Sequence, residues 1–172
     1  MEKLLKQVKQ LEIHIPDYAK LKPTVSAANV GWHIEHSLMV FVTIITGLEN
    51  SDPALYKGSF TMNKFLVYAL NKIPRGKARA PKIVQPVGEM IPENVLPQVE
   101  KAVAKIKALA NLQKHHHFPH PYFGSLNLKE TIKFLTIHTK HHLNIIEDIL
   151  HVKPHRSNYF LGTQHFLIIN YA

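Results

Sequence analysis

The sequence predicts an all-α protein: a four-helix bundle with a long crossover connection and a short extra helix after the second helix. Apolar residues recur every three or four positions in four long segments, which is the periodicity of amphipathic helices. One of these segments, residues 26–50, is apolar almost all round and therefore belongs in the middle of a bundle. A proline-rich stretch, residues 73–93, follows the short helix and has the length needed to cross a bundle from end to end.

The chain of 172 residues is most simply one domain. A chain of this length buries about 70% of the surface that it exposes when unfolded, so metals or disulfides are not needed for folding. We expect a helical core over about residues 1–151. Residues 152–172 form a tail with an apolar patch at 166–169, which would be unfavourable in water. We therefore expect the tail to pack on the bundle or across the interface of a homodimer.

Apolar spacing and polar residues that can act as caps predict the first three helices. Leu4, Leu5, Val8 and Leu11 predict a helix over residues 2–12. Ser26 is a suitable N-cap for the second helix, which runs to about Asn50. Residues 59–72 form a third, shorter helical segment. Its expected packing residues are Phe60, Phe65, Leu66, Tyr68, Ala69 and Leu70.

The two remaining helices flank a histidine-rich loop. The fourth helix begins at Glu93 or Asn94 and continues to about Lys114, where the loop HHHFPHPYFG follows. Asn127 can cap the last helix, and Glu130 at its third position completes a capping box. Residues 131–150, TIKFLTIHTKHHLNIIEDIL, continue that helix without proline or glycine. This last helix carries the chemistry that the sequence suggests.

Composition excludes several classes of function. The sequence contains no cysteine, which removes disulfides, thiolate metal ligands and a cysteine nucleophile, and which is compatible with a reducing compartment. The N-terminal segment is charged and amphipathic, so we expect no secretory signal. The longest apolar run, residues 38–45, is far shorter than the roughly 18 residues of a membrane span. We therefore expect a cytoplasmic protein without a membrane partner.

The net charge of +9 raises nucleic acid as a partner. One segment concentrates basic residues without an acid between them: Lys72, Arg75, Lys77, Arg79 and Lys82. It also contains prolines and lacks an aromatic residue that could stack on bases. A solvated basic loop is the favoured interpretation. We expect no nucleic-acid partner, although the charge keeps that hypothesis open.

Histidine pairs spaced four residues apart are weak evidence on their own. With 13 histidines in 172 residues, chance supplies about one such pair. The chain contains three, and two of them, His116/His120 and His151/His155, have a proline inside. The remaining pair, His138 and His142, falls on one face of the last helix within its apolar stripe. Buried imidazoles need partners, which can be neighbouring polar groups or a shared metal ion, and the spacing alone leaves both interpretations open.

The second helix also presents histidine inward. His36 lies in line with Asn29, Trp32, Thr43 and Gly47, and His33 lies one turn earlier. Three histidines from two helices would fill three tetrahedral positions around an ion and leave the fourth for water or substrate. That arrangement is typical of a catalytic metal site rather than a structural one.

These residues resemble the DinB-like superfamily of metal-binding four-helix bundles. The segment NVGWHIEH, residues 29–36, is similar to the first ligand helix of that family, and FGSL followed by HTKHHL, within residues 123–143, is similar to its last. The resemblance covers about residues 1–151. The stretch HPYFG, residues 120–124, indicates a branch of the superfamily whose activity is not established.

The resemblance implies a divalent metal bound by His36, His138 and His142. His33 and His141 are then neighbours of the ligands, and either remains an alternative donor. Zinc or nickel is the expected ion, and iron or copper also suits three imidazoles. Many relatives follow the last ligand with Arg and Gln, whereas Leu143 and Asn144 follow it here, which leaves the substrate and any thiol cofactor open.

Characterised members of the superfamily include bacillithiol and mycothiol S-transferases and a mycothiol-dependent isomerase. The resemblance therefore implies a metal-dependent enzyme, a transferase or hydrolase, that activates a low-molecular-weight thiol or water for a small-molecule substrate. Asn29, Thr43 and Thr131 are candidate pocket residues, although an ordinary helix residue is the favoured interpretation for each taken singly. His115, His116, His117 and His120 could shape a pocket mouth. No general base is identified. The alternative is a non-catalytic metal-binding or ligand-binding stress-response protein.

Overall fold

The computed structural model describes residues 1–76, 80–87 and 91–151, and this part of the chain is mostly helical. The helical prediction is confirmed for these residues. The prediction that the tail packs on the bundle or across a homodimer interface concerns residues 152–172, which lie outside the described part. The α-helices of the described residues are α1 (Glu2–Ile13), α2 (Val30–Glu49), α3 (Met62–Leu70), α4 (Val95–Ala108) and α5 (Leu128–Leu150). None of the described helices has both the length and the apolar character needed to cross a membrane.

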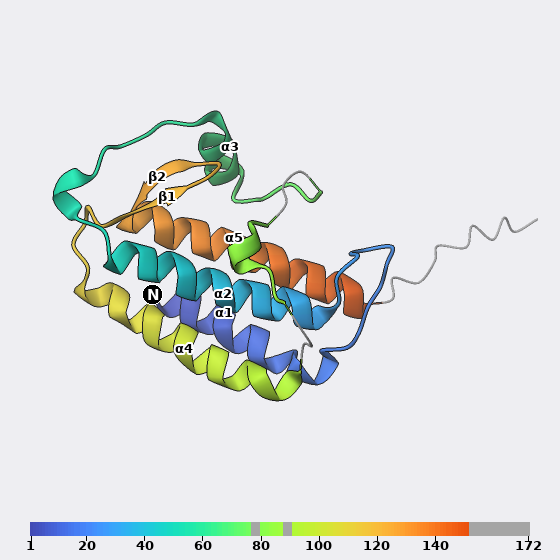
Figure 1. Cartoon of the computed structure of the whole chain (residues 1–172). Helices are drawn as coiled ribbons and strands as arrows, with labels where there is room; N and C mark the ends of the chain where they lie inside the picture. Colours follow the sequence, from blue (N-terminus) through green and yellow to red (C-terminus); the bar gives the residue numbers. More distant parts are fainter. Residues whose placement is uncertain (77–79, 88–90, 152–172) are drawn as a thin grey trace, which may run out of the picture.

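Four of the helices, α1, α2, α4 and α5, lie side by side (Figure 1). Helices α1 and α2 each pack against both α4 and α5. The core between them consists of side chains that are almost completely buried, as the amphipathic spacing predicts: Leu4, Val8, Leu11, Ile34, Leu38, Phe41, Ile45, Ile106, Leu135 and Ile146. Most residues of α2 are buried, in agreement with its nearly uniform apolar character.

Helices α2 and α4 run in the same direction (Figure 1). The chain between them must therefore return along the length of the helices, and it does so through α3 and the irregular segment that follows. Short 3-10 turns at Lys82–Val84 and Pro92–Asn94 interrupt this segment. Within this predicted crossover, the turn at Lys82–Val84 packs against α2.

An antiparallel hairpin of β1 (His117–His120) and β2 (Gly124–Asn127) corrects the all-α prediction. The sequence predicted a loop in this region, which contains Pro119 and Pro121. A two-stranded ribbon has a free edge on each side, so Pro119 can lack an N–H without breaking the ladder. The backbone N–H of His117 donates to Ser51 Oγ at 2.9 Å and ties the hairpin to the end of α2.

Helix α2 begins at Val30 rather than near Ser26. Its N-cap is Asn29, whose side-chain oxygen accepts a hydrogen bond from the backbone N–H of Trp32 at 2.9 Å. Ser26, the cap that the sequence analysis expected, instead accepts the backbone N–H of Ala28 and contacts the ring of His33. Ser26 therefore contacts a side chain of α2 instead of capping the helix.

The short helix α3 also differs from the prediction. Its buried residues are Lys64 and Val67, whereas Phe60, Phe65, Leu66 and Leu70 are between 47% and 73% exposed. Lys64 bonds Glu130 at 2.9 Å, and Tyr68 donates to the Glu130 carbonyl at 2.7 Å. The helix is thus held to the start of α5 by polar contacts, and its apolar face is turned outward. Helix α4 likewise ends earlier than expected, at Ala108, because a 3-10 turn and the hairpin follow.

The predicted capping box at the start of α5 is confirmed. Asn127 Oδ1 accepts the backbone N–H of Glu130 at 2.9 Å, and Glu130 Oε2 accepts the backbone N–H of Asn127 at 3.0 Å. The helix then continues to Leu150. The apolar stripe that packs against α1 and α2 then decides which residues of the helix face inward.

Gly31 near the start of α2 supplies a test of the packing. A Cβ at this position would overlap the ring of Tyr18, which is buried and whose hydroxyl donates to Glu35. We expect Gly31→Ala to lower the free energy of unfolding by about 1–2 kcal/mol, since overpacking outweighs the better helix propensity of alanine. Urea unfolding measures the change. Gly58→Ala, where the added Cβ would lie 3.6 Å from Tyr56 Oη, should change it by less than about 0.5 kcal/mol. Equal effects of the two substitutions would contradict the packing described.

Candidate metal centre

Three histidine side chains converge between α2 and α5. The Nε2 atoms of His36 and His138 are 3.2 Å apart, and the Nε2 atoms of His142 and His138 are also 3.2 Å apart. One ring nitrogen from each of the three histidines lies within 4.8 Å of the other two. Two nitrogens that are each 2.0–2.1 Å from one tetrahedral ion are separated by about 3.3–3.4 Å. The three side chains therefore lie close enough together to bind one metal ion.

Helix geometry explains why the three rings meet. His138 and His142 are four residues apart on α5 and so lie one above the other on the face that packs against α2. Trp32, one turn before His36, stacks on the His36 ring with a centroid distance of 4.8 Å and an interplanar angle of 12°. His36 and His142 are 3% and 6% exposed. His138 keeps some exposed surface, but its Nδ1 atom is buried.

The hydrogen-bond partner of His36 outside the cluster determines which of its ring nitrogens carries the proton. His36 Nδ1 lies 2.6 Å from the backbone carbonyl of Val84, in the crossover. A carbonyl oxygen only accepts hydrogen bonds, so Nδ1 carries the proton and Nε2 presents its lone pair to the cluster. A metal-binding histidine commonly donates its second nitrogen to a carbonyl in this way. No sequence motif marks Val84 for this role, because the contact depends on where the crossover returns over α2.

The cluster of Nε2 atoms accommodates a cation better than it accommodates protons. Because His36 presents a lone pair, its contact with His138 requires the proton on His138 Nε2, and this one proton cannot be directed at both His36 Nε2 and His142 Nε2. With the proton on Nδ1 instead, two lone pairs face each other at 3.2 Å. A cation receives all three Nε2 lone pairs at once, so the donor set fits a metal ion.

The electrostatics of the cluster favour neutral rings. Burial lowers the pKa of His36, and burial followed by the neighbouring histidines lowers the pKa of His138 and of His142 well below the usual value of 6.5. Burial, His36, His141 and Arg75 lower the pKa of His33 to about 4. At neutral pH these imidazoles are therefore uncharged, which is the form that binds metals.

His33 joins the cluster through the outer nitrogen of His142. The Nδ1 atoms of the two rings are 2.9 Å apart, and His33 Nε2 lies 3.0 Å from Ser26 Oγ. The sequence analysis placed His33 beside the ligands and kept it as an alternative donor. In the structure both of its ring nitrogens have partners other than the central Nε2 atoms.

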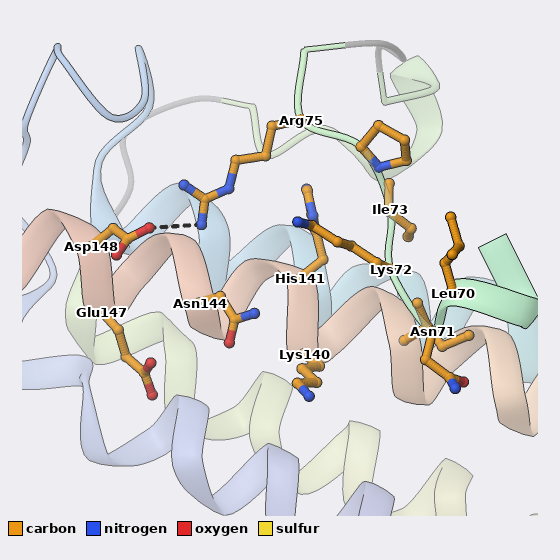
Figure 2. A pocket seen from close by; sticks show the side chains of 12 residues that line it. Leu70, Asn71, Lys72, Ile73, Arg75, Lys140, His141, Asn144, Glu147 and Asp148 are labelled. Atoms are coloured by element: carbon orange, nitrogen blue, oxygen red, sulfur yellow. Dashed lines mark ion pairs between the residues drawn. The ribbon is translucent and has the colours of Figure 1, made fainter. Parts of the chain in front are cut away.

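His141, the other alternative donor, is directed elsewhere. It lines a cavity of about 960 Å³ between α5 and residues 70–75, shown in Figure 2. Burial and then the charge of Arg75 lower the pKa of His141. The cavity is bordered by Lys72 and Lys140 and by the ion pair of Arg75 with Asp148, at 2.9 Å. None of the three clustered histidines lines this cavity.

The candidate pocket residues lie at the starts of α2 and α5 and in the second half of α2. The Asn29 side chain caps α2, and the Thr131 hydroxyl donates to the carbonyl of Leu126 at 3.2 Å. Thr43 lies partly buried two turns after His36. None of the three lines the cavity beside His141. Asn29 and Thr131 therefore have structural roles in holding the helix starts.

The histidine-rich loop lies at the hairpin and contributes one partly buried ring that packs among aromatic side chains. His120 stacks on Phe123, with centroids 4.4 Å apart, and meets Phe134 edge-on at 4.6 Å, one turn before His138. His115 is exposed, while His116 and His117 are partly exposed. Of the basic segment, Lys72, Arg75 and Lys82 are exposed, whereas Lys77 and Arg79 lie outside the described residues.

Comparison with known proteins gives one match. A family model described as a protein of unknown function, DUF1569, matches residues 7–149. The matched range includes His33, His36, His138 and His142. No curated protein and no solved structure matches the chain.

The aromatic surroundings of His120 predict a pH-dependent contribution to stability. Burial lowers the pKa of His120 to about 4, from 6.5. Between these values the unfolded chain binds a proton that the folded chain does not. Stability therefore falls as the pH falls, by at most about 1.4 kcal/mol per pH unit. We expect His120→Phe, which keeps an aromatic ring, to lose this part of the pH dependence when both proteins are unfolded in urea with chelator from pH 7 to 4.5. If the free energy of unfolding changes with pH in the same way in both proteins, the ring of His120 is not shielded from water as described.

Proposed function

We propose that this chain, which belongs to the DUF1569 family, is a metal-dependent enzyme of the DinB-like type, in which His36, His138 and His142 hold one divalent ion. The proposal rests on one observation above all. Three imidazole Nε2 atoms from two helices converge in the core, and a shared cation is the partner that satisfies all three. The side-by-side packing of four long helices and the crossover after α3 support placement among DinB-like four-helix bundles.

The chemistry follows from the number of ligands that the protein provides. Three protein ligands leave at least one coordination position for water or a substrate. A divalent ion in such a site lowers the pKa of the water or thiol that it binds. The sequence has no cysteine, so a thiol nucleophile would have to come from a low-molecular-weight thiol rather than from the chain itself. We therefore propose activation or transfer of such a thiol, with a small molecule as substrate.

The residues of the chain prepare the site in three ways. Burial keeps the imidazoles neutral, so that they do not have to lose protons before binding the ion. The carbonyl of Val84 holds the ring of His36 by its Nδ1 proton. Trp32 covers one face of the same ring and excludes water from it. Zinc or nickel suits a site of imidazole donors with an open position, and the availability of metals in the cell selects between them.

Metal analysis of protein produced without an affinity tag tests the proposal. We expect about one divalent ion per chain in the wild-type protein after reconstitution with zinc or nickel. His138→Ala and His142→Ala should each abolish stoichiometric binding, because only two ligands remain. His141→Ala is the matched control, since His141 lies beside His142 but lines the separate cavity, and it should retain the ion.

Elemental analysis provides the readout, and circular dichroism checks that each variant is folded. Wild-type protein that is folded but takes up no divalent ion would refute the proposal. Equal metal content in the His138→Ala, His142→Ala and His141→Ala variants would place the ion elsewhere in the molecule.

A further inference from the structure

His33 is held between Ser26 and the candidate metal ligand His142. It is 4% exposed, its Nδ1 is 2.9 Å from His142 Nδ1, and its Nε2 is 3.0 Å from Ser26 Oγ. Ser26 Oγ also accepts the backbone N–H of Ala28 at 3.0 Å. The result is a continuous hydrogen-bonded relay from the loop before α2, through His33, to the outer nitrogen of His142.

The relay can hold its protons in two ways. In the first, Ser26 donates to His33 Nε2, His33 Nδ1–H donates to His142, and the proton of His142 sits on Nε2 inside the cluster. In the second, His33 Nε2–H donates to Ser26, and His142 Nδ1–H donates to the lone pair of His33 Nδ1. A serine hydroxyl has two lone pairs, so Ser26 can accept from both Ala28 and His33. Only the second arrangement leaves His142 Nε2 free to bind an ion.

From this geometry we infer that His33 is a positioning residue of the metal centre, which accepts the Nδ1 proton of His142 and so directs the Nε2 lone pair of His142 at the ion. The inference rests on the proposed metal centre and adds a role that a ligand count does not reveal. His33 does for His142 what the Val84 carbonyl does for His36. The partner of His36 is a backbone atom, whereas the partner of His142 is a side chain that substitution can remove.

His141 shows why proximity alone does not give this role. Its ring centroid is 5.1 Å from that of His142, and the corresponding distance for His33 is 5.2 Å. The two neighbours are equally near. The ring of His33 shares a hydrogen bond with His142, while the ring of His141 meets His142 edge-on and borders the cavity of Figure 2. His141→Ala is therefore the matched control for substitutions at His33.

Two variants at position 33 separate a positioning role from a packing role. His33→Phe keeps a ring of similar size but offers no acceptor to His142. His33→Asn places a carbonyl oxygen near the former position of Nδ1 and can accept the same proton. We expect His33→Phe to bind Zn²⁺ about 10–100-fold more weakly than the wild-type protein. His33→Asn should recover most of the affinity, and His141→Ala should stay within about twofold of the wild-type protein.

Competition for Zn²⁺ with a chromophoric chelator measures the affinities, and the visible absorption of the Co²⁺-loaded proteins reports the ligand geometry. The Co²⁺ spectrum of His33→Asn should match that of the wild-type protein, and that of His33→Phe should differ. Equal Zn²⁺ affinities of the Phe and Asn variants would overturn the inference while leaving the metal centre intact. Absence of metal from every protein, the wild type included, would refute the proposed function and this inference with it. Circular dichroism of each variant confirms that affinities are compared between folded proteins.

Discussion

The close contact of α2 with α5 is the constraint on which the rest of the structure depends. Three imidazoles can meet at 3.2 Å only if the two helices approach closely at His36 and keep their rotation fixed. Glycines on α2 allow neighbouring rings to approach: Tyr18 packs on Gly31 and Phe118 on Gly47. The capping box at Asn127 fixes where α5 begins. Removing polar rings from water is unfavourable, and the apolar core around them provides the compensating burial.

Features that depend on local spacing could be predicted from the sequence. Amphipathic periodicity identified the long helices, and the four-residue interval placed His138 and His142 on one stripe. The capping residues of α5 could be predicted because both partners of a capping box lie within a few positions of the chain. The apolar pattern also predicted that α2 presents histidine inward, and both His33 and His36 are buried. The choice of His36 rather than His33 as a ligand came from the family resemblance and stays a prediction.

Features that depend on distant contacts could not be predicted. The carbonyl of Val84 accepts a hydrogen bond from His36, which lies 48 positions earlier in the sequence. Ser26 forms a hydrogen bond with His33 instead of capping α2. The hairpin was missed because Pro119 argues against a strand unless the strand has a free edge. The apolar residues of α3 were expected to be buried, but most of them are exposed. Lys64 and Tyr68 hold that helix by polar contacts to Glu130, which the composition of the segment does not reveal.

The hydrogen bond from His36 to the Val84 carbonyl would couple the proposed metal site thermodynamically to the crossover. The carbonyl of Val84 is correctly placed only while the turn at Lys82–Val84 packs against α2. An ion that favours this orientation of His36 must stabilise the docked turn by the same free energy with which the docked turn strengthens ion binding. A molecule that displaces the turn at Lys82–Val84 would therefore weaken ion binding at the proposed site without contacting the ion.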